Sequence, residues 1–139
     1  MRLPLLPVTI ACLSALSFIA PPLAAHERMD ASQFEDYTTG RTLSFSAQGV
    51  PYGIEQYLPG RRVLWAFLGD TCQEGTWYER GGLICFVYEH TPDEQCWSFY
   101  RTETGLRAIF QGPDGPGTEL YEVERSTRPL SCAAPGVGV

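Results

Sequence analysis

The chain has 139 residues, with 16 acidic and 10 basic side chains and a formal net charge of −6 at pH 7. An acidic chain without a basic run excludes the charge pattern of nucleic-acid-binding proteins and disfavours an anionic membrane surface as a partner. The length suffices for one domain with one core.

The first 25 residues have the layout of a secretory signal peptide. Arg2 precedes an uncharged apolar run, 3–25, which ends in small residues after the helix-breaking pair Pro21-Pro22. The run is long enough to cross a bilayer, but its prolines and the lack of following basic residues argue against a membrane span. Cys12 lies inside the run, where we expect it to be removed with the leader and not lipidated.

We therefore predict that residues 1–25 are a signal peptide and that residues 26–139 form a single β-barrel domain with an irregular tail. The predicted location is the periplasm or the exterior of the cell, with no stable membrane insertion after cleavage.

A short helix is predicted at the start of this domain. Asp30 can cap a helix that begins at Ala31 and runs to about Tyr37, with Gly40 after its end.

From Arg41 onward, short runs of β-branched and aromatic residues alternate with turn residues every 8 to 12 positions. The predicted strands are 41–48, 52–58, 61–68, 73–79, 83–89, 95–102, 105–111 and 117–125. The connections are too short for crossover helices, so consecutive strands should pair antiparallel. The expected fold is mainly β: an up-and-down meander of about eight strands forming a small lipocalin-like barrel or a strongly curved sheet.

Side chains alternate between the two faces of a strand, which allows the inner face to be predicted. The turn at 80–82 can pair Trp77 with either Ile84 or Phe86, and both registers leave these three residues on one face. The next turn can place Cys85 opposite Cys96. The predicted core face carries Trp77, Ile84, Phe86, Tyr88, Trp97 and Phe99. The opposite face carries Tyr78, Leu83, Cys85, Val87, Cys96, Ser98 and Tyr100.

Four cysteines remain after the leader: Cys72, Cys85, Cys96 and Cys132. An even number in a small exported chain predicts two disulfides, and none of the spacings is the C-x-x-C of a zinc ribbon. We favour Cys85–Cys96 with Cys72–Cys132, which would also fasten the tail. The alternatives pair Cys72 with Cys85 or with Cys96.

Catalytic chemistry has little support because only two histidines are present, His26 and His90. His90 has no nucleophile motif near it. The stretch 89–94 contains Glu89, His90, Asp93 and Glu94, which could hold a cation but is typical of a solvated turn. Cleavage after Ala25 would make His26 the first residue, where its ring and the terminal amine could chelate copper with His90. We retain both histidines as weak metal candidates and expect no cofactor.

Acidic residues such as Glu55, Asp70 and Glu74 could form a glycosidase pair only if two of them faced each other across a cleft. The glycine-rich stretch 112–117 lacks the lysine and helix start of a phosphate loop, so it is interpreted as a hairpin turn. No coherent catalytic set results, and the chain is predicted not to be an enzyme.

Aromatic residues are the remaining feature, with 3 Trp, 7 Tyr and 7 Phe. They can fill a core, or they can line a ligand pocket at the mouth of a barrel, since an eight-stranded barrel holds side chains or one small ligand. The candidate binding residues are Trp65, Trp77, Phe86, Trp97 and Phe99.

Several stretches of the chain are "GRTLSF", "PYGIEQYLPGRRVLW", "LICFVYE", "QCWSFYR", "GTELYEVE", "PLSC" and the pattern C-x-x-G-T-W-Y-E. Together they resemble small uncharacterised exported proteins of Gram-negative bacteria. The resemblance covers most of 34–139 and implies a lipocalin-like barrel rhythm without an attached function. The G-x-W of lipocalins is missing near the first strand, and Gly75-Thr76-Trp77 lies in the middle instead.

The leading hypothesis is a non-enzymatic exported β-barrel that binds a small apolar ligand or another exported protein. The alternatives are an inhibitor of an exported hydrolase that uses the turn 89–94 as a plug, and a copper protein that uses His26.

Overall fold

The structure is a computed structural model and describes residues 27–67 and 71–132. Eight antiparallel strands form a closed barrel in which each strand pairs with its neighbours along the chain and β8 returns to pair with β1. The strands are β1 (Thr42–Ala47), β2 (Val50–Leu58), β3 (Arg62–Phe67), β4 (Gln73–Arg80), β5 (Leu83–Tyr88), β6 (Thr91–Arg101), β7 (Leu106–Gly112) and β8 (Gly115–Ser126). The predicted up-and-down meander is confirmed, and it closes into a barrel.

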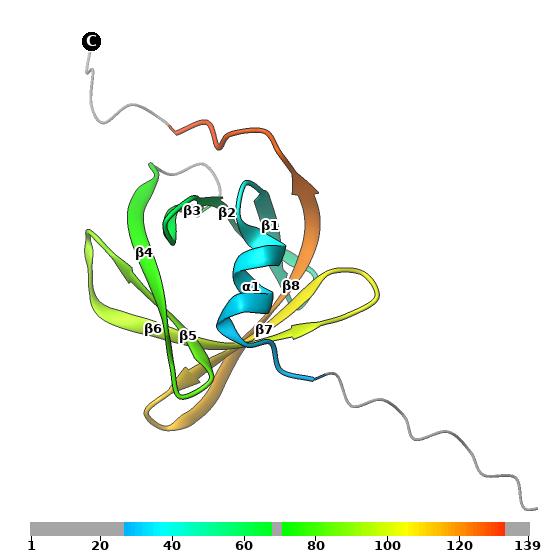
Figure 1. Ribbon diagram of the computed structural model, residues 1–139, viewed down its shortest axis with the longest axis vertical. Coiled ribbons are helices and arrows are strands. Elements are labelled where there is room, and N and C mark those ends of the chain that lie inside the picture. The colour runs from blue at the N-terminus through cyan, green and yellow to red at the C-terminus, as the bar shows by residue number, and fades with distance from the viewer. Residues whose placement is uncertain (1–26, 68–70, 133–139) are drawn as a thin grey trace, which may run out of the picture.

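Helix α1 (Ala31–Thr38) lies across the ring of strands in Figure 1 and closes one end of the barrel. Its start is set by a capping box, in which the backbone N–H of Gln33 donates to Asp30 Oδ1 at 2.8 Å and the Gln33 side chain accepts from the Asp30 N–H. The predicted cap at Asp30 is therefore confirmed. Phe34 projects into the barrel and is fully buried.

The ring of Phe34 meets four other rings, with centroid separations between 4.5 and 6.3 Å. Its partners are Tyr57, Trp77, Phe86 and Phe99. Edge-on and tilted contacts of this kind add to the free energy gained from burial of the rings. The helix is therefore part of the core and acts as a plug for one end of the barrel.

A second contact fastens α1 to the strands. The hydroxyl of Tyr37 donates to Glu122 Oε2 at 2.7 Å, and the same oxygen accepts from the backbone N–H of Leu106 at 2.8 Å. Arg125 Nε lies 3.2 Å from the other oxygen of Glu122. Burial and the hydrogen bond to Glu122 raise the pKa of Tyr37 to about 12. This buried carboxylate is thus matched by a cation and links the helix to β7 and β8.

The six residues predicted for the core face are all buried: Trp77, Ile84, Phe86, Tyr88, Trp97 and Phe99. Trp77 pairs with Phe86, which decides between the two registers. The Gly81-Gly82 turn makes this possible, since both residues have positive φ and form the two-residue connection that suits a twisted hairpin. On the opposite face, Tyr78 and Val87 are exposed as expected, whereas Cys85, Cys96 and Ser98 are buried.

The favoured disulfides, Cys85–Cys96 and Cys72–Cys132, are both present. Cys85 and Cys96 are directly opposed in the β5–β6 ladder, with Ile84 opposite Trp97. Cys132 connects the segment after β8 to the start of β4. The alternative pairings of Cys72 are wrong.

Three connections are shorter than predicted. β6 starts at Thr91, so the stretch 90–94 is largely strand. β8 starts at Gly115, opposite Gly112, so the stretch 111–117 is largely ladder. β2 starts at Val50, because the turn is formed by Gln48 and Gly49, both at positive φ. In each case a two-residue turn lets the backbone hydrogen bonds continue to the tip, and this outweighs the low strand propensity of proline and glycine.

Among the described residues, no helix has the length and apolar character needed to cross a membrane.

Candidate functional site

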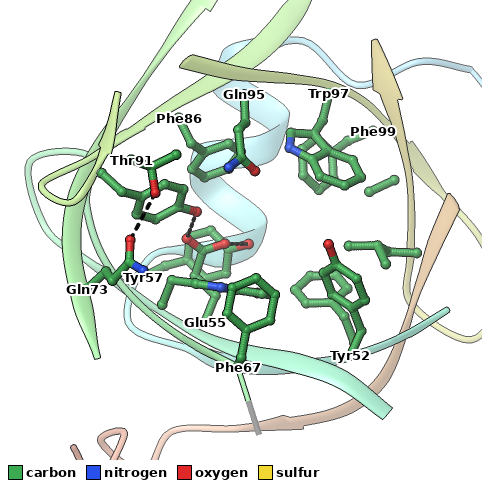
Figure 2. Close-up of a pocket in the computed structure, with 15 residues that line it drawn as sticks. Tyr52, Glu55, Tyr57, Phe67, Gln73, Phe86, Thr91, Gln95, Trp97 and Phe99 are labelled. Carbon is green, nitrogen blue, oxygen red and sulfur yellow. Dashed lines mark hydrogen bonds between the residues drawn. The ribbon is translucent and has the colours of Figure 1, made fainter. Parts of the chain in front are cut away.

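The barrel interior is not completely filled: it contains a cavity of about 50 Å³ between the plug and the end of the barrel away from α1. We call this end the mouth. It contains the ends of β3 and β5, at residues 67 and 88, and the starts of β4 and β6, at residues 73 and 91. Figure 2 shows the lining side chains converging from several strands, with α1 behind them. The lining residues are Phe45, Tyr52, Glu55, Tyr57, Trp65, Phe67, Gln73, Phe86, Tyr88, Thr91, Gln95, Trp97, Phe99, Ala108 and Leu120.

Three aromatic rings stand together at the rim of the cavity. The ring centroids are 5.9 Å apart for Tyr52 and Trp65, 5.7 Å for Tyr52 and Phe67, and 5.4 Å for Trp65 and Phe67. Gly53 makes room for this cluster, because a Cβ at that position would lie 2.4 Å from the indole ring of Trp65. Phe67 is 44% exposed, so the cluster presents an apolar ring face to solvent at the mouth.

Among the described residues, Glu55 is the one acidic residue in the lining, and its side chain lies near the centre of the view in Figure 2. Alternation along β2 turns Gly53, Glu55 and Tyr57 inward, and Glu55 is only 4% exposed. The hydroxyl of Tyr88 donates to Glu55 Oε1 at 2.7 Å, and that of Tyr57 donates to Oε2 at 2.9 Å. Each carboxylate oxygen thus accepts one hydrogen bond from a neutral group and can accept another.

Burial raises the pKa of Glu55 to about 7, although the hydrogen bonds from Tyr88 and Tyr57 act in the opposite direction. Burial and the proximity of Glu55 also raise the pKa values of Tyr57 and Tyr88 well above their ordinary value. Near neutral pH the cavity therefore holds a carboxyl group that exchanges readily between its charged and neutral forms, beside two phenols that remain protonated.

Polar groups at the mouth complete the lining. The hydroxyl of Thr91 lies 3.1 Å from Gln73 Oε1, and Gln95 also lines the cavity. Gln73 and Thr91 are the first residues of β4 and β6, and Gln95 lies further along β6. Gln73 is paired with Trp65 in the β3–β4 ladder, so the polar groups border the ring cluster. A few polar groups within an apolar cup are typical of small-molecule sites.

Of the five candidate binding residues, Trp65, Phe86, Trp97 and Phe99 line the cavity. Trp77 does not: it packs against Phe34 at 5.1 Å, and the guanidinium of Arg61 lies 4.5 Å from its ring centroid. It belongs to the closed half of the barrel.

Sequence reasoning did not include Glu55, Tyr52, Phe67 or the polar mouth residues among the binding candidates. A signal existed for Glu55, since the alternation that turns Tyr57 inward also turns residue 55 inward. A signal also existed for Phe67, which follows Trp65 at the two-residue spacing that returns a side chain to the same face of a strand. Tyr52 gave no such signal, because a register shift in the β1–β2 pair interrupts the alternation there.

The hypothetical glycosidase pair is not formed by Glu55 and Glu74, since Glu55 faces the interior and Glu74 is exposed on the outer surface. Asp70 lies outside the described residues. Paired-carboxylate chemistry at this cavity would therefore need an acid other than Glu74.

The residues suggested for a cation at 89–94 do not share a site. Glu89 and His90 form the exposed tip of the β5–β6 hairpin, while Glu94 pairs with Arg80 and accepts from the Tyr78 hydroxyl on the outer face. Glu94 also lies near the sulfurs of Cys85 and Cys96, but these are joined in a disulfide and offer no thiolate. His26 lies outside the described residues, so the copper hypothesis stays a prediction.

Neither a protein-family model, nor a curated protein, nor a solved structure matches this chain. The resemblance to exported proteins of Gram-negative bacteria therefore stays a prediction.

Proposed function

We propose that this chain is a non-enzymatic binding module that holds a small, largely apolar ligand in the mouth of its barrel. One observation carries the proposal: a cavity of about 50 Å³, lined mainly by aromatic rings, lies beneath a rim where Phe67 is 44% exposed. A ligand that covers these rings gains roughly 25 cal/mol for each Å² of apolar surface removed from water.

The size of the cavity limits what can enter. A pocket that encloses a drug-sized molecule has a volume of roughly 300 Å³ or more, whereas the space here suits a head group of a few atoms. The ligand would therefore insert one small end and rest its remaining part against Tyr52 and Phe67 at the rim.

We propose further that the protein acts in the periplasm or outside the cell. Its two disulfides are of the kind that persists in oxidising compartments. The predicted leader at 1–25 agrees with this location.

The inhibitor hypothesis has weaker support. Its contact region, 89–94, consists of a two-residue tip, Glu89–His90, followed by the ladder of β6. Such a tip offers little surface with which to block an active site.

Filling the cavity tests the binding proposal. Ala108 lines the cavity and is 1% exposed, so Ala108→Leu should place three extra carbon atoms in the space that a ligand would occupy. The matched control is Val87→Leu, which enlarges an outward side chain that is 44% exposed.

The measurement is a titration with benzyl alcohol, followed by the fluorescence of the cavity tryptophans Trp65 and Trp97. We expect saturable binding to the wild type and to Val87→Leu, and at least tenfold weaker binding to Ala108→Leu. Equal affinity in all three proteins, or no saturable change in the wild type together with no molecule retained in native mass spectrometry, would contradict the proposal.

A further inference from the structure

Within the described residues, two carboxylates are buried in the barrel, and Glu55 differs from Glu122 in having no cationic partner there. Glu122 lies 3.2 Å from Arg125, whereas Glu55 takes part in no ion pair among the described residues. No arginine or histidine lines the cavity around Glu55 within the described part of the chain. A charged carboxylate in such surroundings is unfavourable unless a cation or enough hydrogen bonds compensate the loss of water around it.

The surroundings of Glu55 suit one class of cation. Tyr88 donates to the carboxylate, its ring stacks on Phe86 with centroids 6.1 Å apart, and Trp65 is paired with Glu55 in the β2–β3 ladder. The rim rings of Tyr52 and Phe67 line the same cavity. The faces of aromatic rings attract ammonium groups, and the attraction grows when the cation is removed from water. A carboxylate within a group of rings therefore offers both a full negative charge and several partial ones.

A metal ion fits this lining less well. Calcium takes six to eight oxygen ligands, and magnesium needs an octahedral set of oxygens. The cavity supplies one carboxylate and a few neutral oxygens among its rings, so an organic cation with an apolar surface matches it better.

We propose that the ligand of this cavity is a small organic cation, a primary or N-methylated amine whose ammonium group enters beside Glu55 and whose apolar part lies against Tyr52 and Phe67. This inference rests on the proposed function, namely that the mouth binds a small ligand. The volume of about 50 Å³ admits the ammonium end and leaves the apolar part at the rim.

The raised pKa of Glu55, about 7, gives binding a dependence on pH. An ammonium ion favours the ionised carboxylate, so when Glu55 is protonated its proton must leave for the solvent as the amine binds. Among the described residues, the other titratable side chains that line the cavity are Tyr52, Tyr57 and Tyr88, and burial beside Glu55 raises the pKa values of Tyr57 and Tyr88 well above their ordinary value. Amine affinity should therefore rise with pH up to about 8, and the increase between pH 5 and pH 8 should be about 90-fold.

The experiment compares benzylamine with benzyl alcohol, which has the same ring and a similar shape but no charge. Isothermal titration calorimetry is carried out at pH 5, 6, 7 and 8, in buffers of different ionisation enthalpy that report proton release. The proteins are the wild type, Glu55→Gln, and Glu89→Gln as a control that removes an exposed carboxylate at the mouth end of β5. Circular dichroism verifies that each variant is folded.

For the wild type and Glu89→Gln at pH 8, we expect benzylamine to bind at least tenfold more tightly than benzyl alcohol. Binding near pH 6 should release close to one proton. Glu55→Gln should lose the preference for the amine, the proton release and the pH dependence.

Two results would overturn the inference, and they have different meanings. If both probes bind equally well to the wild type, or if Glu55→Gln retains the preference for the amine, the cation inference is wrong and the binding function stands. If neither probe binds to the wild type and native mass spectrometry shows no retained molecule, the proposed function is wrong as well.

Discussion

Replacement of Glu55 by glutamine should stabilise the protein above neutral pH. Glutamine has the same shape, and its carbonyl oxygen can accept a hydrogen bond from Tyr57 or Tyr88. The charged form of Glu55 is unfavourable in the folded barrel, because burial raises its pKa from 4.5 to about 7. In the unfolded chain the carboxyl group ionises in water at its ordinary pKa.

The sign follows from proton linkage. A pKa that is raised in the folded state means that the native protein holds the proton more tightly, so the contribution of this group to stability is complete below pH 4.5 and is lost as pH rises through 7. A shift of about 2.5 units at roughly 1.36 kcal/mol per unit corresponds to about 3 kcal/mol. The stability of Glu55→Gln relative to the wild type should therefore increase by about 3 kcal/mol between pH 4 and pH 8.5.

The assay is equilibrium unfolding in guanidinium chloride, followed by tryptophan fluorescence at several pH values with both disulfides intact. The other acidic groups titrate in both proteins, so the difference between their free energies of unfolding isolates residue 55. Glu89→Gln, which alters an exposed carboxylate, should show a difference that barely changes with pH. A difference for Glu55→Gln that is constant from pH 4 to pH 8.5 would refute the reasoning.

Two further predictions concern the parts that hold the barrel together. Replacement of both Cys72 and Cys132 by serine should lower the free energy of unfolding by about 4 kcal/mol, and the same change at Cys85 and Cys96 by about 3 kcal/mol, because the sequence separations are 60 and 11 residues. Denaturant unfolding measures both, and a larger loss for the shorter loop would contradict this ranking. Phe34→Ala should lower the same free energy by roughly 3–5 kcal/mol, since it removes a fully buried ring that meets four others. A loss below about 1 kcal/mol would mean that α1 is not part of the core.

Local patterns predicted much of the wall of the barrel. The cap at Asp30 is a short-range signal, because the residues that satisfy the first turn of a helix are neighbours in sequence. The opposition of Cys85 and Cys96 could be predicted in the same way, since the two cysteines flank a single turn and alternate in phase. Strand ends were less predictable, because hydrogen bonding across a ladder decides whether a residue such as Thr91 belongs to a turn or to a strand.

The candidate site was predicted only in part. Aromatic residues on strands indicated that a pocket was possible, and four of the five chosen rings line it. The fifth, Trp77, has the same alternation as Phe86 and is paired with it in the β4–β5 ladder, but its ring lies between Phe34 and the Arg61 guanidinium and does not line the cavity. Depth along the barrel depends on the tilt and stagger of all the strands, which alternation within one strand does not contain.

By itself, the sequence determined the two periodic features of this protein, alternating faces along short strands and a capped helix before them, because both arise from interactions among residues close together in the chain. Only the tertiary structure decided that β8 closes on β1, that Phe34 plugs one end and that Glu55 faces the remaining space with no cation from the described residues beside it. The physical reason is that a cavity is the volume that side chains from many strands leave unfilled, and no single segment of the sequence determines that volume.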